Sequence, residues 1–145
     1  MMSDEQQKTL QKLYLEQRIV TSNIAALQQR LEMVEVYLSN YRTSLSVLEE
    51  LMNRKEGEDV MLNVGGRILV HARLARVDKV TRDIGSGVRV ESSLEDAKTD
   101  SQESIGILEK QYEELSQEYR RQSDYAETLN ARLQELAAKI RGPGE

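Results

Sequence analysis

The first third of the chain carries a seam of apolar residues at alternating steps of three and four. Twelve of its thirteen positions are apolar or aromatic, and Gln17 is the exception. The positions are Leu10, Leu13, Gln17, Val20, Ile24, Leu27, Leu31, Val34, Leu38, Tyr41, Leu45, Leu48 and Met52. A 3.5-residue period held this long predicts a helix in a left-handed coiled coil. At 1.5 Å per residue the seam is about 63 Å long, which is too long to cross a compact domain of this size.

A second seam with the same alternation fills the last third of the chain. It comprises Ile105, Leu108, Tyr112, Leu115, Tyr119, Gln122, Ala126, Leu129, Leu133, Leu136 and Ile140. Ser92 and Glu95 have the spacing of a capping box with Ser92 as the cap, so this helix is predicted to begin near Ser92 or Ser93. Gly57 is suited to the left-handed position that follows a helix, so the first helix is predicted to end at 54–56. We expect helices over 1–56 and 92–141, and a tail at 142–145.

Between the seams, residues 57–91 change to the two-residue period of β-strands. Gly65-Gly66 and Gly85-Ser86-Gly87 are turn sequences, so the pattern predicts four strands in two consecutive hairpins. The apolar residues of these strands are Val60, Leu62, Val64, Ile68, Val70, Ala72, Leu74, Val80, Ile84, Val88 and Val90. Isolated hairpins are marginally stable and present unpaired edges. The strands are therefore predicted to oligomerise.

The order helix, two hairpins, helix predicts a single domain over 1–145. The helices must fold back as an antiparallel pair, with Leu10 near Ile140 and Met52 near Ala97. Both termini then lie together at a distal tip, and the hairpins form the base. The predicted fold class is mainly α with a small β insert, an antiparallel two-helix coiled coil joined by two β-hairpins.

Composition narrows the possible functions. The formal net charge is −5, there is no Cys, and charged residues make up 31% of the chain. The absence of Cys excludes disulfides and thiolate chemistry. No stretch reaches the roughly 18 apolar residues that span a bilayer, and the polar N-terminus does not resemble a secretory signal. We therefore expect a cytoplasmic protein without a membrane or nucleic-acid partner.

No group of residues has the pattern of a catalytic, metal or cofactor site. His71 is the only histidine, and one imidazole without Cys or a carboxylate cluster does not make a closed metal site. It is expected on the outer face of its strand. The Gly-Ser-Gly at 85–87 precedes a strand and lacks a following helix, so it is interpreted as a hairpin turn and not a phosphate loop. The basic residues of the insert are interleaved with acids and lack aromatic stacking partners.

The double hairpin is the most specific part of the sequence. It contains Asp83-Ile84-Gly85-Ser86-Gly87-Val88-Arg89-Val90-Glu91, followed by Leu94-Glu95-Asp96-Ala97. A second match is Leu62-Asn63-Val64-Gly65-Gly66, leading into a strand that ends His71-Ala72. Over its whole length the chain resembles the α-class subunits of the prefoldin family, including archaeal ones. It departs from many relatives in having Ile68-Leu69 after the first glycine turn, where a Phe is common.

The resemblance implies a hexamer of two α and four β-class subunits, whose hairpins assemble into β-barrels. It further implies an ATP-independent holdase that captures non-native polypeptides at the coiled-coil tips and delivers them to a group II chaperonin. No cofactor is implied.

The predicted client-binding residues are the apolar residues near the two termini. They are Leu10, Leu13, Tyr14, Leu15, Ile19, Leu136, Ala137 and Ile140. Tyr14, Leu15 and Ile19 lie off the seam, whereas Leu10, Leu13, Leu136 and Ile140 also fit as plain seam residues. Gln17 and Gln122 either loosen the distal half of the coil or fix its register, and the register role is favoured.

Two other classes of function stay open. Open strand edges also permit a structural protein that polymerises into filaments. The coils alone would also suit an adaptor that scaffolds a complex.

Overall fold

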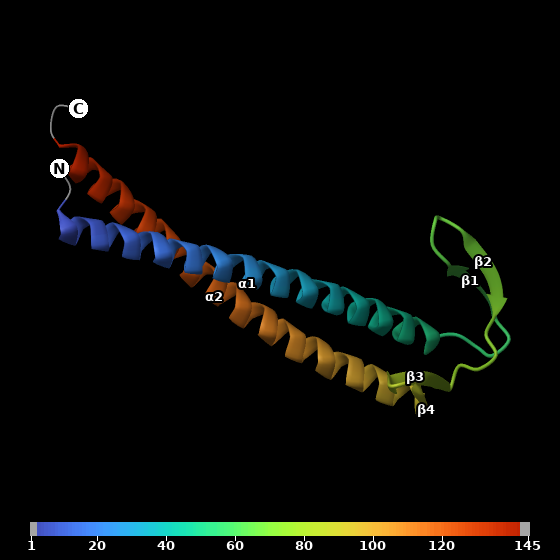
Figure 1. The fold of residues 1–145 in the computed structure, drawn as a ribbon. Helices are drawn as coiled ribbons and strands as arrows, with labels where there is room; N and C mark the ends of the chain where they lie inside the picture. The colour runs from blue at the N-terminus through green and yellow to red at the C-terminus, as the bar shows by residue number, and fades with distance from the viewer. Residues whose placement is uncertain (1–2, 143–145) are drawn as a thin grey trace. The chain divides into compact units, whose positions relative to one another are not determined.

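The computed structural model describes residues 3–142, which form two long helices and four short strands (Figure 1). In chain order the elements are α1 (Asp4–Leu51), β1 (Asp59–Asn63), β2 (Leu69–Arg73), β3 (Lys79–Gly85), β4 (Val88–Ser93) and α2 (Leu94–Arg141). This order confirms the predicted helix, double hairpin and helix. The chain divides into two compact units, which are described in turn.

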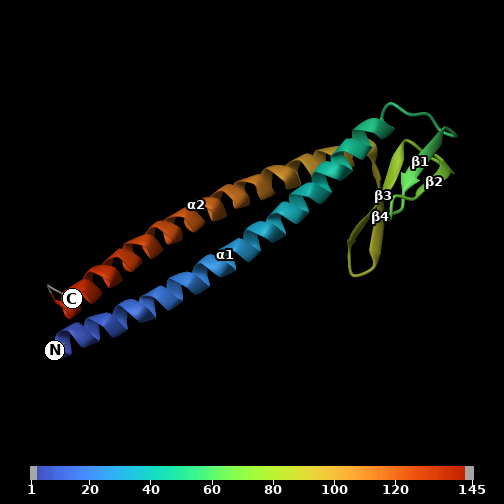
Figure 2. The ribbon, with the colours of Figure 1, turned by 90° about the horizontal axis from the view of Figure 1, so that it is seen from above.

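The first unit consists of the described residues of Met1–Val36 and Lys110–Glu145. The N-terminal part of α1 lies antiparallel beside the C-terminal part of α2 (Figure 2). The core of this unit contains Leu13, Val20, Leu129 and Leu133, with Leu10, Ile24, Ala126 and Leu136 packed against it. Every one of these residues belongs to a predicted seam, so the 3.5-residue pattern located the core correctly.

Polar side chains fix the register of the first unit. Gln17 donates to Asn130 Oδ1 at 2.6 Å, and Gln28 donates to the Tyr119 hydroxyl at 3.2 Å. The sum of the two residue numbers is the same in both pairs, so the helices stay in step between them. The cross-helix bond of Gln17 supports its predicted register role. Gln122 instead donates to Glu118 of its own helix and makes no such link.

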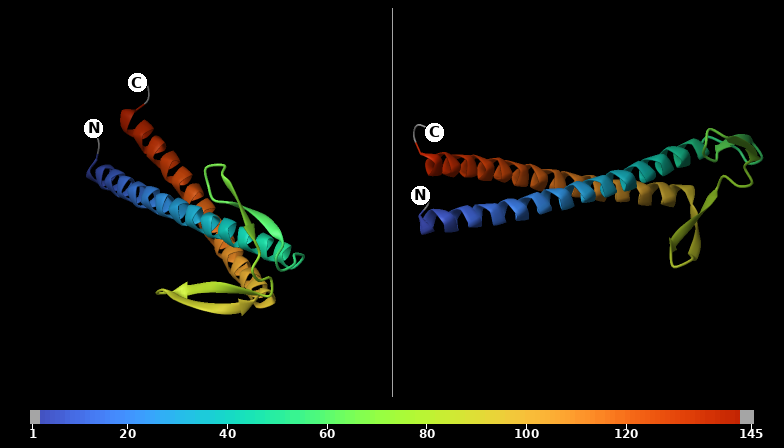
Figure 3. Two further views of the ribbon diagram at one scale, coloured as in Figure 1. Left: turned by 90° about the vertical axis from the view of Figure 1, so that its right-hand side faces the viewer. Right: turned by 45° about the horizontal axis from the view of Figure 1, so that its top comes forward.

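The second unit, Tyr37–Glu109, contains the other ends of the helices and both hairpins. Leu48, Leu94 and Ala97 form its buried cluster, and Leu51 and Val80 pack against them. Val80 thus joins strand β3 to the helix pair. A second link is the ion pair between Arg82 of β3 and Asp100 of α2. Figure 3 shows β4 leading directly into α2.

Both helix boundaries at the hairpins differ from the prediction. Helix α1 ends at Leu51, because the N–H groups of Asn53 and Arg54 bond to carbonyls three residues back and tighten the chain into turns. Gly57 has the expected positive φ of 82°. Its N–H donates to the Leu74 carbonyl, so Gly57 belongs to the start of the first hairpin and not to the end of the helix.

The cap of α2 also lies one residue later than predicted. Ser93 Oγ accepts the Asp96 N–H at 3.1 Å, so Ser93 and not Ser92 is the N-cap. Strand β4 continues to Ser93 and helix α2 begins at Leu94, so no residue separates the two elements.

The two hairpin turns are built alike. The Asn63 side chain accepts the Gly65 N–H at 3.0 Å, and the Asp83 side chain accepts the Gly85 N–H at 2.9 Å. Each glycine is followed by two residues with positive φ: Gly66 at 57° with Arg67 at 63°, and Ser86 at 54° with Gly87 at 76°. The Ile68 N–H donates to the Gly65 carbonyl at 3.0 Å, so the first turn centres on Gly66-Arg67, one residue later than predicted.

We predict that Arg67→Gly stabilises the first hairpin. A residue with a Cβ in the left-handed region carries a penalty of about 1 kcal/mol that glycine avoids. The reverse change at the equivalent position, Gly87→Arg, is the matched control and should destabilise the second hairpin by a similar amount. Hydrogen exchange of the strand amides measures both hairpins in one experiment. Equal protection of the β1–β2 amides in Arg67→Gly and the parent would contradict the prediction.

Candidate functional site

The first candidate surface is the apolar face of the β1–β2 hairpin. Val60 pairs with Ala72 and Leu62 pairs with Val70, so the predicted apolar residues share one face. Leu62 is 51% exposed and Val70 is 43% exposed. Val64 and Ile68 at the turn are also exposed, and Leu74 lies half-buried just beyond β2. Val60, Leu62 and Leu74 also line a groove beside the end of α1. A partly exposed apolar face with two free strand edges is the arrangement expected of an oligomerisation site.

The β3–β4 hairpin presents a smaller apolar surface. Val80 is used inside the second unit, where it packs against the helices. Ile84, Val88 and Val90 remain exposed, and Asp83 and Gly85 flank a bulge in the strand pairing. The two hairpins form separate two-stranded sheets, so no barrel is closed within one chain. Closure of a barrel requires further chains.

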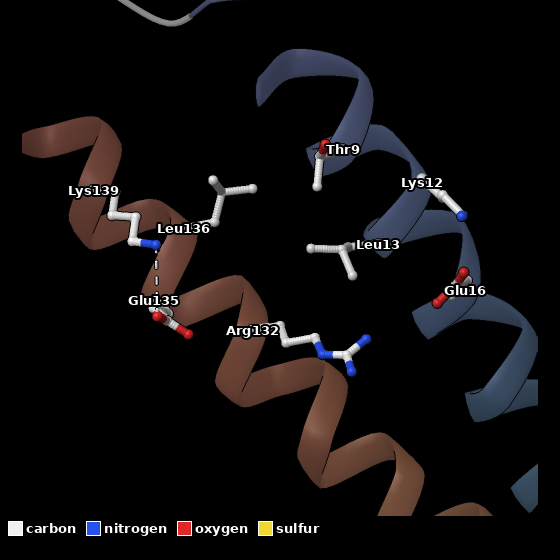
Figure 4. Close-up of a pocket in the computed structure, with 8 residues that line it drawn as sticks. All are labelled: Thr9, Lys12, Leu13, Glu16, Arg132, Glu135, Leu136 and Lys139. Carbon is white, nitrogen blue, oxygen red and sulfur yellow. Dashed lines mark ion pairs between the residues drawn. The ribbon is translucent and has the colours of Figure 1, made fainter. Parts of the chain in front are cut away.

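The second candidate surface is the tip formed by the terminal parts of the helices. Leu13 and Leu136 point toward each other from α1 and α2 in Figure 4. They belong to a cavity of about 340 Å³, whose other lining residues are Thr9, Lys12, Glu16, Arg132, Glu135 and Lys139. The floor of this cavity is apolar and its rim carries both signs of charge.

The predicted tip residues divide into two groups. Leu13 is buried in the core, and Leu10, Leu136 and Ile140 are half-buried along the seam, as is Ala137 beside it. In contrast, Tyr14, Leu15 and Ile19 are 53%, 58% and 52% exposed. The structure therefore packs Leu10, Leu13 and Leu136 together and leaves Tyr14, Leu15 and Ile19 facing solvent. Client binding by either group stays a prediction.

Two tyrosines of α2 form further cross-helix bonds in the first unit. The Tyr112 hydroxyl donates to Glu35 at 2.9 Å, and the Tyr125 hydroxyl donates to Glu16 at 2.9 Å. The hydrogen bond to the neighbouring carboxylate raises the pKa of each phenol above its ordinary value of 10.0. The neutral phenol is the form that holds the helices together, because a phenolate would repel the carboxylate.

We predict that these tyrosines make the first unit sensitive to alkali. A pKa raised on folding contributes stability that is present below the unfolded pKa, near 10.0, and is lost as the pH rises through the folded pKa. The double variant Tyr112→Phe with Tyr125→Phe should be less stable than the parent at neutral pH. The difference should shrink above pH 10, as measured by thermal unfolding from pH 7 to 11. A difference that stays constant across this range would contradict the prediction.

Sequence reasoning missed one group of exposed apolar residues. Met33 and Val36 on α1 are 57% and 59% exposed and lie off the seam. The signal that finds them is a second set of three- and four-residue steps on the opposite side of α1, beginning at Leu15 and Ile19.

Within residues 3–142, no cluster of three His, Cys, Asp or Glu side chains is arranged to hold a metal ion. No helix of this described part is long and apolar enough to cross a membrane. His71 is exposed on β2, on the opposite face from the Leu62 and Val70 pair. It lines the groove beside the end of α1 together with Met61 and Leu62.

Paired helices joined by two self-contained hairpins define a class of coiled-coil protein with a β insert. The family model described as "Prefoldin subunit" matches residues 20–139. The chain belongs to the prefoldin family, which consists of chaperone subunits and not enzymes.

The chain is also similar to individual members of this family. Prefoldin subunit alpha of Methanococcoides burtonii is 27% identical over 139 residues, covering 96% of this chain and 91% of the relative. Among solved structures, filamentous PFD from Methanocaldococcus jannaschii matches with a TM-score of 0.63 and 24% identity, covering 79% of this chain and 95% of that one. The prefoldin beta subunit from Thermococcus strain KS-1 matches with a TM-score of 0.59 and 15% identity, covering 88% and 90%. The structural matches concern the fold.

Proposed function

We propose that this chain is the α-class subunit of a hexameric, ATP-independent holdase. It assembles with β-class subunits, two α with four β, and holds non-native polypeptides for a group II chaperonin. The observation that carries the proposal is the exposure of apolar side chains at the tip, where Tyr14, Leu15 and Ile19 are each more than half exposed. Family membership and the similarity to α-class relatives support the assembly with β-class partners.

Weak contacts suit a holdase because a client must also be released. Burial of one large apolar side chain contributes roughly 1.5–3 kcal/mol, and a single tip offers only a few such side chains. Several tips in one complex then give useful avidity while each contact stays reversible. The half-buried seam residues beside the tip cavity add to this surface when the helix ends fray.

The decisive experiment deletes residues 1–15 together with 137–145 and co-expresses the chain with a β-class subunit. The deletion should abolish the suppression of aggregation of a denatured model protein and leave the mass of the complex at the value expected for the shortened hexamer. Loss of assembly instead would show that the assignment of tip and base is wrong. An intact complex that still protects the model protein would exclude the tips as the client site.

A filament is the second candidate, because both two-stranded sheets have free edges that allow open-ended polymerisation. One structural neighbour is described as filamentous PFD. Electron microscopy of the isolated chain, with and without a β-class subunit, separates the candidates. Long filaments from the isolated chain would favour the filament over the closed hexamer.

A further inference from the structure

Helix α1 carries a second heptad seam on its outer side. Within the first unit this outer seam consists of Leu15, Ile19, Ser22, Ala26, Gln29, Met33 and Val36, at alternating steps of four and three. All seven residues are exposed, so the packing against α2 does not use them. Five of the seven are apolar, whereas a helix face turned to water normally carries charged or polar residues.

The outer seam is uncharged along its whole length. Residues 19–29 contain no Asp, Glu, Lys or Arg on any face of the helix, in a chain that is 31% charged. The outward positions of α2 in the same unit are different. Five of them are charged and exposed: Lys110, Glu114, Arg121, Asp124 and Glu135. The outward face of α1 is therefore uncharged where the outward face of α2 is charged, so the lack of charge is specific to α1.

The shape of the outer seam favours an α-helix as its occupant. The larger apolar residues lie at its two ends, Leu15 with Ile19 and Met33 with Val36, and small Ser22 and Ala26 lie between them. Small residues allow two helix axes to approach to about 8 Å, and three- and four-residue spacing matches the side-chain rows of a second helix. An extended strand has a two-residue period and matches this spacing poorly.

The area argues for a transient partner and against a second copy of this chain. From Leu15 to Val36 the seam is about 32 Å long, and a helix is about 10 Å wide, which gives about 320 Å². Stable complexes bury about 800 Å² on each partner. The outer seam therefore offers less than half of the area that a lasting dimer needs. A small, neutral and apolar surface fits a partner that is bound and released.

We propose that the outer seam of α1 captures amphipathic α-helical segments of non-native polypeptides. The inference rests on the proposed holdase function and adds a substrate class to it: the tips accept apolar chain of any conformation, and the outer seam selects helical segments. It begins at Leu15 and Ile19 of the exposed tip group and continues that surface along α1 as far as Val36.

The test introduces two opposite charges into the seam away from the tip. The variant is Ala26→Glu with Met33→Lys in the complex assembled with a β-class subunit. The matched control, Ala131→Glu with Gln117→Lys, places the same new residues at exposed outward positions of α2. Both variants keep the net charge of the chain. Circular dichroism and the mass of the complex establish that folding and assembly are unchanged.

Two fluorescent peptides of identical composition serve as probes. One has apolar residues at three- and four-residue steps, and the other has them at alternate positions. The parent and the control should bind the first peptide more tightly than the second, measured by anisotropy. The seam variant should lose at least tenfold in affinity for the first peptide only. Equal binding by the seam variant and the control, with aggregation of a denatured protein still suppressed, would overturn the inference alone.

Two other results would have different meanings. If the parent complex suppresses no aggregation at all, the holdase function itself fails, and the inference fails with it. If the isolated chain self-associates in solution and only Ala26→Glu with Met33→Lys abolishes this, the occupant is a second copy and the proposed client class is wrong.

Discussion

Replacing Leu62 and Val70 together by aspartate is expected to leave the chain folded and to prevent its assembly. The two residues face each other across β1 and β2, and both are largely exposed in the single chain. Their removal from water in a complex would contribute roughly 1.5–3 kcal/mol each. Aspartate loses this contribution and adds the desolvation of a carboxylate, so the affinity for β-class subunits should fall at least a hundredfold. Native mass spectrometry of the co-expressed complex measures the effect.

The control for this variant uses the opposite face of the same hairpin. Met61 pairs with His71, and both are exposed. Aspartate at these two positions brings the same charge to the same strands, and assembly should persist. If both double variants assemble as the parent does, the β1–β2 face is not the oligomerisation surface. If only the Met61 and His71 variant fails, the interface lies on the other face of the hairpin.

The largest effect on stability is expected for Leu129→Ala. Leu129 is fully buried in the first unit, where it packs with Leu13, Val20 and Leu133. Truncation leaves a cavity at the centre of this cluster, between the two helices. The expected loss is about 3 kcal/mol in the free energy of unfolding, measured as a shift of the urea midpoint at constant slope.

Leu15→Ala is the matched control for this truncation. It removes the same atoms from a side chain that is 58% exposed, and it should change stability by well under 1 kcal/mol. A similar loss in both variants would mean that the seam does not provide the core. A small loss in both would mean that the first unit collapses around the cavity without penalty.

Periodicity was sufficient to predict the helices, the hairpins and the buried seam. The predicted seam positions within the helices are buried or half-buried, apart from Tyr41, because a 3.5-residue period leaves only one way to remove those side chains from water. The pairing of β1 with β2 was predicted equally well, since the alternation of apolar residues assigns Val60, Leu62, Val70 and Ala72 to one face.

The details that the sequence did not predict depend on individual polar contacts. Helix α1 stops early where Arg54 is held between Glu50 and Glu58, at 2.8 and 2.9 Å, a contact that no hydrophobic pattern encodes. The first turn lies one residue later than predicted, where the Ile68 N–H donates to the Gly65 carbonyl. Met33 and Val36 were missed because each looks like an isolated exposed residue until the outward positions of α1 are counted together.

The two helices are attached to their hairpins in different ways. Strand β4 passes into α2 between Ser93 and Leu94, whereas residues 52–58 connect α1 to β1 through turns. A force along α2 is therefore transmitted directly through the covalent backbone to the hydrogen bonds between β4 and β3. A force along α1 first extends its connector and must separate Arg54 from its carboxylates. The second unit is therefore joined stiffly to α2, whereas its connection to α1 can extend.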